Sequence, residues 1–371
     1  MRPVIPSFRL PVREVETTID ILSRLGVEFR CGEKIDLQDG LNKLGREFEA
    51  MILAVGAGPA VKPDLPGANL ESVVQAIDLL RKAKHEPRSR IRGSVIVLGG
   101  GNTAVDAALV CKKLGAEKVR IVSLERRSEM PASPLALDEA VEEGIEFDPG
   151  WGATALVGEP DGRIQAELSR CLSLHDDQGR FHPVLESVCG LKISADRIVL
   201  AMGQKRKPPM LGSGRLKEPV GDAAIDPVTL QSRNNLGLFI CGDALNGPSS
   251  VVHSLASGRE AAISVDRFLR GESLEWDRGF WNGAQVKEYE SLPNRAIGGP
   301  RCALKRVSFS ERTLEIETES CFSIKEARRE AERCLSCGRS FEMNKTCWFC
   351  LPCEIECPVK ALEVRMPYWV R

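Results

Sequence analysis

The sequence predicts an α/β protein with a parallel sheet, followed by a small, cysteine-rich α+β segment. Residues 94–98 are a short apolar run, typical of a buried strand, and lead through Gly99-Gly-Gly101 into an apolar helix that ends near residue 114. Residues 118–124 form a second such run, and this order predicts a βαβ unit with two parallel strands. A separate tail is expected because six of the 13 cysteines fall after residue 333.

The helices and strands before and after this βαβ unit are predicted from the local pattern of apolar and turn residues. Residues 12–26 predict an amphipathic helix that stops at Gly26, and residues 50–56 and 197–203 predict two buried strands that end at Gly56 and Gly203. These two glycines are further candidate cofactor-binding residues. In residues 151–195, glycine and aspartate recur between short segments and mark turns, which indicates inserted antiparallel strands. A strand at 236–243 and a helix at 250–269 follow, then a connecting region rich in charge and turn residues. Ser323 and Glu326 form a capping box for a last helix, which ends near Arg333.

Length and composition indicate a globular protein of two or three domains. The chain has 371 residues, of which 43% are hydrophobic and 28% are charged. A net charge of −1 argues against a general nucleic-acid or membrane-surface role, and no apolar run approaches the length of a membrane span. Six cysteines kept as thiolate ligands suit a reducing cytoplasm. None of the other seven cysteines forms a C-x-x-C pair, so we expect no dithiol-relay mechanism.

The tail carries the most specific motif of the chain. Its last four cysteines read C-x-x-C-x-x-C-x-x-x-C-P, which is the spacing of bacterial ferredoxins, whereas zinc ribbons use separated C-x-x-C pairs. An iron–sulfur site is therefore favoured over a zinc site or a disulfide knot. Six thiolates suffice for one 4Fe–4S cluster and leave a second possible. The candidate metal ligands are Cys334, Cys337, Cys347, Cys350, Cys353 and Cys357.

A dinucleotide site is predicted where the strand at 94–98 turns into its helix. Gly99-x-Gly101-x-x-Ala104 has the spacing of a phosphate-binding turn, and the helix amides would face the anion. Glu125 stands where an acid accepts hydrogen bonds from the ribose hydroxyls of NAD and favours NADH. Arg126 and Arg127 come next and leave NADPH open, since either could bind its 2′-phosphate. The turn's candidate residues are Gly99, Gly100, Gly101, Asn102, Thr103 and Ala104.

A flavin site is predicted after the strand at 236–241. Gly242-Asp243 ends that strand, and the acid would bind hydroxyls of the ribityl chain. The helix that begins near Ser250 and Val251 would direct its amides at the flavin ring oxygen, where negative charge gathers on reduction. The alternative is an ordinary turn at the end of a strand. No general acid or base is expected, because hydride transfer to a flavin needs none.

Several phrases together resemble the glutamate synthase small-subunit family of pyridine-nucleotide-dependent flavoproteins. The resemblance implies two nested Rossmann-like domains of the disulfide-reductase kind. It also implies that NAD(P)H reduces FAD, and that electrons pass singly to 4Fe–4S clusters and a partner subunit. The domains expected are FAD-binding at 1–90 and 206–272, NAD(P)-binding at 91–205, a connection at 273–320 and the iron–sulfur segment at 321–371. The phrases are Ile5-Pro-Ser-Phe-Arg-Leu-Pro11, Leu53-Ala-Val-Gly-Ala57, Gly99-Gly-Gly-Asn-Thr-Ala-Val-Asp106, Glu129-Met-Pro-Ala132, Leu200-Ala-Met-Gly-Gln204, Cys241-Gly-Asp243, Gly247-Pro-Ser-Ser-Val-Val252 and Glu326–Gly338.

The sequence departs from this family at its start. Members carry a βαβ fingerprint for the ADP half of FAD ahead of the phrase that begins at Ile5, and no GxGxxG occurs here before Gly99. We therefore expect either that the chain is truncated or that a separately encoded N-terminal FAD segment supplies the missing part. We also expect weak or absent FAD binding by the chain alone. The partner fits a glutamate synthase or a sulfite-reductase-associated assembly. The alternative is a truncated electron-wiring module without flavin, which docks an iron–sulfur cluster on its partner.

Overall fold

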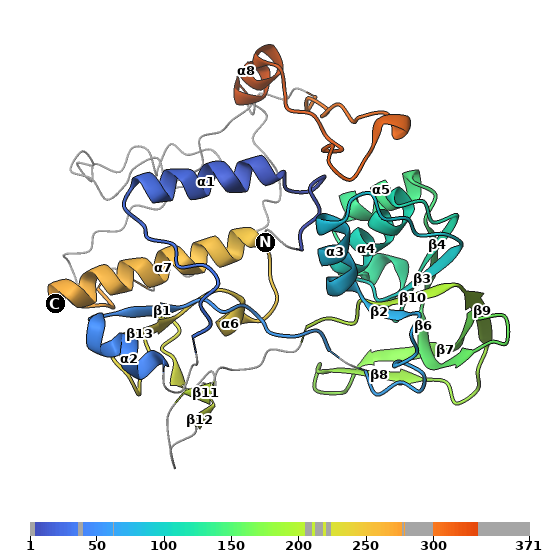
Figure 1. Ribbon diagram of the computed structural model, residues 1–371, viewed down its shortest axis with the longest axis horizontal. Helices are drawn as coiled ribbons and strands as arrows, with labels where there is room; N and C mark the ends of the chain where they lie inside the picture. Colours follow the sequence, from blue (N-terminus) through green and yellow to red (C-terminus); the bar gives the residue numbers. More distant parts are fainter. Residues whose placement is uncertain are drawn as a thin grey trace, which may run out of the picture. The chain divides into compact units, whose positions relative to one another are not determined.

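The computed structural model describes residues 4–35, 40–61, 63–204, 210–211, 218–219, 224–276, 278 and 300–332 (Figure 1). The chain divides into two compact units. The first comprises Met1–Gly271 and Ser308–Thr318, and the second comprises Glu272–Val307 and Glu319–Arg371. The six tail cysteines lie outside the described residues.

A five-stranded parallel sheet forms the centre of the first unit. The strand order is β2-β10-β3-β4-β5, and every neighbouring pair is parallel. The pairing of β3 with β4 on either side of a helix confirms the predicted βαβ unit. The strands are β2 (Val73–Gln75), β10 (Arg197–Leu200), β3 (Ser94–Leu98), β4 (Lys118–Ser123) and β5 (Glu146–Pro149).

Both faces of this sheet are covered, which explains why its strands are apolar throughout rather than alternating. Val95 and Val97 of β3 pack with the helices α3 (Ala76–His85), α4 (Asn102–Lys113) and α5 (Pro134–Glu142). Ile96 and Leu98 face the other way and pack against a second, antiparallel sheet. Figure 1 shows the helices on one side of β3 and β10 and the strands β6 to β9 on the other.

The antiparallel sheet is the insertion predicted for residues 151–195. Strand β7 pairs with each of the other three strands in antiparallel fashion. The inward-facing residues of this sheet include Leu156, Ile164 and Leu168, which are 3% exposed or less. They form a hydrophobic cluster with Ile96 and Leu98 of the parallel sheet. The strands are β6 (Trp151–Gly158), β7 (Ile164–His175), β8 (Phe181–Leu185) and β9 (Leu191–Ala195).

A smaller parallel pair forms a second sheet, built from segments far apart in the chain. Strand β1 (Met51–Leu53) pairs with β13 (Leu238–Ile240), and Cys241 N donates to Leu53 O at 3.2 Å. This pairing brings the two predicted strands that end near Gly56 and Gly242 to one sheet edge. The remaining helices of the first unit are α1 (Val12–Arg24), α2 (Gly40–Glu47), α6 (Asp243–Asn246) and α7 (Val251–Arg270). The strands β11 (Met210–Leu211) and β12 (Glu218–Pro219) form a separate antiparallel pair.

Two details differ from the expectations. The main sheet includes β2, and α3 packs on its core, although both precede residue 91, where we expected the NAD(P)-binding domain to begin. The physical reason is that β10 still has a free edge beyond β3, and β2 pairs there. Helix α1 ends near Gly26, which has φ +94°, as predicted, but none of its residues is buried.

In the second unit, the described part centres on α8 (Ile324–Glu332). The predicted capping box is confirmed, because Ser323 N donates to Glu326 Oε2 at 2.8 Å and Glu326 N donates to Ser323 Oγ at 3.3 Å. Hydrogen bonds from Ser323 lower the pKa of Glu326. The guanidinium of Arg329 donates to Cys302 Sγ through two nitrogens, at 2.8 and 3.0 Å.

Buried charges fasten the returning segment 308–318 to the helices of the first unit. Lys113 Nζ lies 2.6 Å from Glu143 Oε1, and both side chains are only 3% exposed. Arg312 contacts Glu142 at 3.0 Å and Glu143 at 3.8 Å. Breaking a buried pair is costly because the remaining charge stays desolvated.

We predict that Lys113→Ala lowers the free energy of unfolding by about 3 kcal/mol, because Glu143 then stays buried with only the more distant Arg312. Urea denaturation measures the change. The control is Lys118→Ala, which removes a 56%-exposed lysine paired with Glu146 and should cost less than about 1 kcal/mol. Equal losses in the two variants would contradict the assignment of Lys113 to a stabilising buried pair.

Candidate functional site

The first candidate site lies at the carboxyl ends of β3, β4 and β10. Gly99 leaves β3 with φ +140°, and a Cβ there would come within 2.4 Å of the carbonyl oxygen of Ala201, which continues β10. Only glycine fits so close to a neighbouring strand. Ala104 is fully buried in α4, as expected for the small residue that lets the helix approach the sheet.

The start of α4 offers unpaired amides to a ligand. Gly101 precedes the helix, and a Cβ built on it would meet no atom within 4 Å. In the part of the chain that the structure describes, the amides of Gly101, Asn102 and Thr103 donate to no group. Asn102 accepts from Ser133 N at 2.9 Å, which ties the start of α5 to this turn. An open backbone with free amides and a helix dipole fits a pyrophosphate.

Glu125 lies directly against the glycine turn. Its carboxylate oxygen is 2.5 Å from the position of a Cβ on Gly100, so a side chain there would displace it. The main chain of Glu125 is fixed, because its carbonyl accepts from Ser123 Oγ at 3.0 Å and from Gly150 N at 2.9 Å. The acid predicted to bind ribose hydroxyls is therefore held beside the glycine turn.

The two candidate arginines differ in their environment. Arg127 stacks on the ring of Phe147 at 3.8 Å and donates to Leu137 O at 3.3 Å, so its guanidinium is used within the protein. Arg126 is exposed and lines a cavity of about 430 Å³ with Arg170. Sequence reasoning missed Arg170, because it comes from the inserted sheet and no spacing relates it to the turn.

The second candidate site lies at the carboxyl ends of β1 and β13. Gly242 follows β13 with φ +65°, and its amide donates to Ser257 Oγ at 3.0 Å. Asp243 Oδ1 accepts from Ser249 N and Oγ, at 3.1 and 2.7 Å, and from Ser254 Oγ at 3.2 Å. These bonds orient the carboxylate and leave its other oxygen to accept from a ligand hydroxyl.

Helix α7 begins beside this carboxylate. Ser250 caps it, because its Oγ accepts from His253 N at 3.2 Å. Within the described residues, the amides of Val251 and Val252 have no acceptor, so the positive end of a 20-residue helix is open. This arrangement fits the flavin ring oxygen that the sequence predicted for it.

The two remaining candidate glycines lie on the chain segments that connect the two sheets. Gly56 and Gly203 have φ +77° and +86°, and a Cβ on either would meet no atom within 4 Å. Val61 N donates to Gly203 O at 3.1 Å, and Gln204 Nε2 donates to Gly58 O at 3.2 Å. The segments that follow β1 and β10 therefore run side by side as a double crossover between the sheets.

Other reactive groups do not form a redox centre in the described chain. Burial raises the pKa of the Cys111 thiol to about 12 and raises the pKa of Cys241. All seven described cysteines are free thiols. No group of histidine, cysteine or carboxylate side chains that could hold a metal ion occurs among the described residues, and no described helix is long and apolar enough to cross a membrane.

Two parallel sheets, each with a glycine turn and an open helix start at its carboxyl edge, define a two-dinucleotide oxidoreductase fold. The pattern of the pyridine nucleotide-disulphide oxidoreductase family matches residues 11–258. The chain belongs to this family, and the expectation of an NAD(P)H-dependent oxidoreductase is confirmed at that level.

Relatives and solved structures agree with this assignment. The chain is 30% identical over 350 residues to the NADP(+)-dependent formate dehydrogenase subunit beta of Moorella thermoacetica, covering 90% of this chain and 49% of that protein. It is 30% identical over 309 residues to the glutamate synthase [NADPH] small chain of Mycobacterium tuberculosis, covering 74% and 60%. The chain thus spans about half to three-fifths of these relatives.

FprA of Mycobacterium tuberculosis in complex with NADPH superposes with a TM-score of 0.54 at 16% identity, over 72% of this chain and 74% of FprA. This likeness confirms the α/β fold class.

We predict that Gly101→Val weakens nucleotide binding without unfolding the protein. The φ of −88° at Gly101 suits any residue and the space around it is open, but the new side chain would occupy the approach of the pyrophosphate. The dissociation constant for NADH, followed by nucleotide fluorescence, should rise roughly tenfold or more, which is about 1.4 kcal/mol. Gly158→Val is the control at another open glycine. Unchanged binding in Gly101→Val, with an unchanged melting temperature, would exclude the turn as the nucleotide site.

Proposed function

We propose that the chain passes electrons between NAD(P)H, FAD and a 4Fe–4S cluster, and on to a partner protein. The observation that carries the proposal is the pair of sheet edges, each of which offers a glycine turn, a carboxylate and unpaired helix amides. The nucleotide edge is formed by Gly99–Ala104 and Glu125, and the flavin edge by Gly242, Asp243 and the start of α7. The cluster belongs to the cysteine tail, outside the described residues.

The roles of the chain's own residues follow from their positions. The α4 amides bind and orient the nucleotide pyrophosphate, and Glu125 accepts from the ribose. Asp243 accepts from the ribityl hydroxyls, and the α7 amides stabilise negative charge at the flavin ring. When bound, the flavin supplies the conversion between hydride transfer and single-electron transfer. No described side chain is needed as an acid or base.

A partner protein is supported by two observations. Both relatives are named as a subunit or a small chain of larger enzymes. Among the described residues, neither the nucleotide edge nor the flavin edge includes a separate site for a terminal organic substrate. We place the partner in a glutamate synthase-like or sulfite-reductase-associated assembly in the cytoplasm.

We propose NADH as the preferred nucleotide, because the carboxylate of Glu125 lies against the turn and would repel a 2′-phosphate. In Glu125→Arg that acid is replaced by a cation, and preference should move toward NADPH by about 1–3 kcal/mol. Binding titrations of NADH and NADPH against wild type and variant measure the shift. Glu117→Arg, at an exposed acid that precedes β4, is the matched charge control. A wild type that favours NADPH tenfold would overturn the role of Glu125.

NADPH is the second candidate, and a specific feature favours it. Arg126 and Arg170 line one cavity beside Glu125, and Arg170 is held by stacking over Trp151 at 4.4 Å. Two guanidinium groups that line one cavity would suit a 2′-phosphate. Glu186 lines the same cavity and offsets one of these charges, which is why we rank NADPH second.

The cysteine spacing of the tail predicts a bound iron–sulfur cluster. Protein purified without oxygen should contain iron and acid-labile sulfide and show broad visible absorption, since the C-x-x-C-x-x-C-x-x-x-C-P spacing suits a cluster. Cys350→Ser should abolish the absorption, because a ligand thiolate is lost. Cys31→Ser, which replaces an exposed free cysteine, should leave it unchanged. Zinc without sulfide in the wild type would show that the tail is a zinc site.

A further inference from the structure

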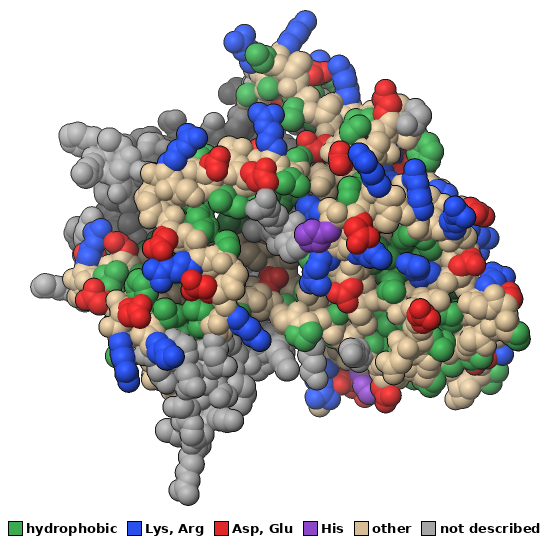
Figure 2. Space-filling model, in the orientation of Figure 1, with side chains coloured by type: hydrophobic (Ala, Val, Ile, Leu, Met, Phe, Trp, Pro, Cys, Tyr) green, Lys and Arg blue, Asp and Glu red, His purple; other side chains and the backbone are tan. Residues whose placement is uncertain are grey.

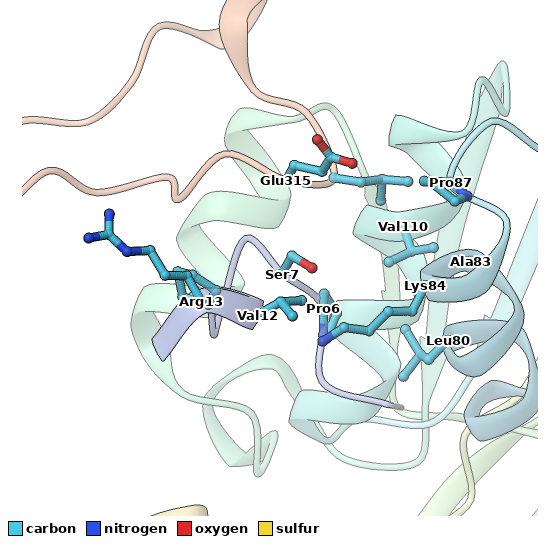
Figure 3. Close-up of a pocket in the computed structure, with 12 residues that line it drawn as sticks. Pro6, Ser7, Val12, Arg13, Leu80, Ala83, Lys84, Pro87, Val110 and Glu315 are labelled. Atoms are coloured by element: carbon cyan, nitrogen blue, oxygen red, sulfur yellow. The ribbon is translucent and has the colours of Figure 1, made fainter. Parts of the chain in front are cut away.

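A cleft on the first unit is unused by the two cofactor sites. It has a volume of about 370 Å³ and lies between the N-terminal segment, helices α3 and α4, and the returning segment 308–318 (Figure 3). Its floor is apolar and rigid, because Leu80, Ala83 and Val110 belong to the main core and are 5% exposed or less. Pro6, Pro87 and Leu314 line its walls.

The N-terminal wall of the cleft is fixed in place. Lys84 Nζ donates to Ile5 O at 2.5 Å, and Figure 3 shows the side chain of Lys84 extended toward Pro6. Arg9 adds a second tie, because its guanidinium lies 2.9 Å from Asp106 and also contacts Glu139 at 2.5 Å. The cleft is thus preformed, and filling it would cost little ordering of the protein.

One side of the cleft continues into a strongly basic segment. Residues 81–92 contain six lysines and arginines and a single acid, Glu86, in a chain of net charge −1. Arg88 and Arg90 are exposed and have no ion-pair partner among the described residues. The pair of Arg81 with Asp78 is exposed, and such pairs exchange partners at little cost. In Figure 2, basic side chains stand beside hydrophobic ones over α3 to α5.

The segment 308–318 shows what kind of chain this surface accepts. It alternates apolar and acidic residues from Leu314 to Glu317. Leu314 packs against the main core, while Glu315 lines the cleft. An acidic segment with an apolar anchor therefore already lies at the rim, and the cleft beside it is open.

We propose that the cleft and the basic segment 81–92 dock an acidic segment of a partner protein, with an apolar side chain of that segment inserted into the cleft. An apolar centre with a charged rim is the anatomy of a protein interface. A nucleic acid would need aromatic platforms or a continuous phosphate track, and no aromatic residue is among the described residues that line this cleft. The inference extends the proposed partner role but does not depend on either cofactor.

The position of this surface leaves the nucleotide free to exchange. Residues 86–93 lead into β3 at Ser94, so they lie at the amino ends of the parallel strands, whereas the glycine turn lies at the carboxyl ends. A partner held at 81–92 would contact the domain at the edge away from the turn. Docking would therefore not block the site at Gly99–Ala104.

The first test uses a defined probe. A fluorescein-labelled peptide of four Glu-Glu-Leu repeats should bind the full chain, and the same peptide with lysine for glutamate should not. Arg88→Glu combined with Arg90→Glu should weaken binding at least roughly tenfold. Val12→Glu, which places an acid in the cleft wall, should do the same. The matched charge reversal Arg24→Glu with Arg46→Glu, at exposed sites on α1 and α2, should leave binding unchanged.

The second test uses the native assembly. A photo-crosslinking amino acid in place of Pro87 should join the chain to a copurifying polypeptide, with the crosslink mapped to an acidic stretch, and the Arg88→Glu/Arg90→Glu double variant should lose it. Crosslinks to nucleic acid, to a second copy of this chain, or to a partner regardless of charge reversal would overturn the proposal. NADH binding, measured in parallel, must be unchanged in the double variant. A loss of NADH binding would indicate a folding defect, and Val12→Glu then decides whether the cleft is the site.

Discussion

The parallel pairing of β3 with β4 and β10 is the constraint on which the candidate nucleotide site depends. Parallel strands end at one edge, so the turn after Leu98, the acid after Ser123 and the crossover after Leu200 must meet there. The approach is close enough that Ala201 O excludes any side chain at position 99. The same logic repeats in the small sheet, where β1 and β13 bring Gly56 and Asp243 to one edge.

The rest of the first unit keeps these edges in place. The main sheet is covered by helices on one face and by the inserted antiparallel sheet on the other, so its strands cannot slip without exposing Val97 or Leu98. Buried polar contacts extend this support to segments distant in sequence. Thr318 Oγ1 donates to Glu139 Oε1 at 2.7 Å, and Arg9 contacts the same carboxylate. Burial raises the pKa of Asp106 although Arg9 is beside it, so this ion pair is partly offset by desolvation.

Much of this arrangement could be predicted from the sequence, because it depends on local pattern. The apolar run 94–98, the glycine turn and the capping box at Ser323 and Glu326 are local signals, and each is confirmed. What the sequence did not show depends on long-range pairing. Nothing near Val73 indicates that β2 joins β10, and nothing near Arg170 relates it to Arg126. Arg127 could not be distinguished from Arg126 until Phe147 was seen beneath its guanidinium.

We propose that the two sheet edges hold two different ligands, a nucleotide at one and a flavin at the other. The most direct test measures both ligands in the natively purified protein, with any polypeptides that accompany it, for wild type, Gly101→Val and Asp243→Asn. The asparagine keeps the oxygen that accepts from Ser249 and Ser254 and removes only the second acceptor. We predict that Gly101→Val loses NADH binding and keeps FAD, and that Asp243→Asn loses FAD and keeps NADH binding. Loss of both ligands in folded single variants, or of neither, would contradict the claim.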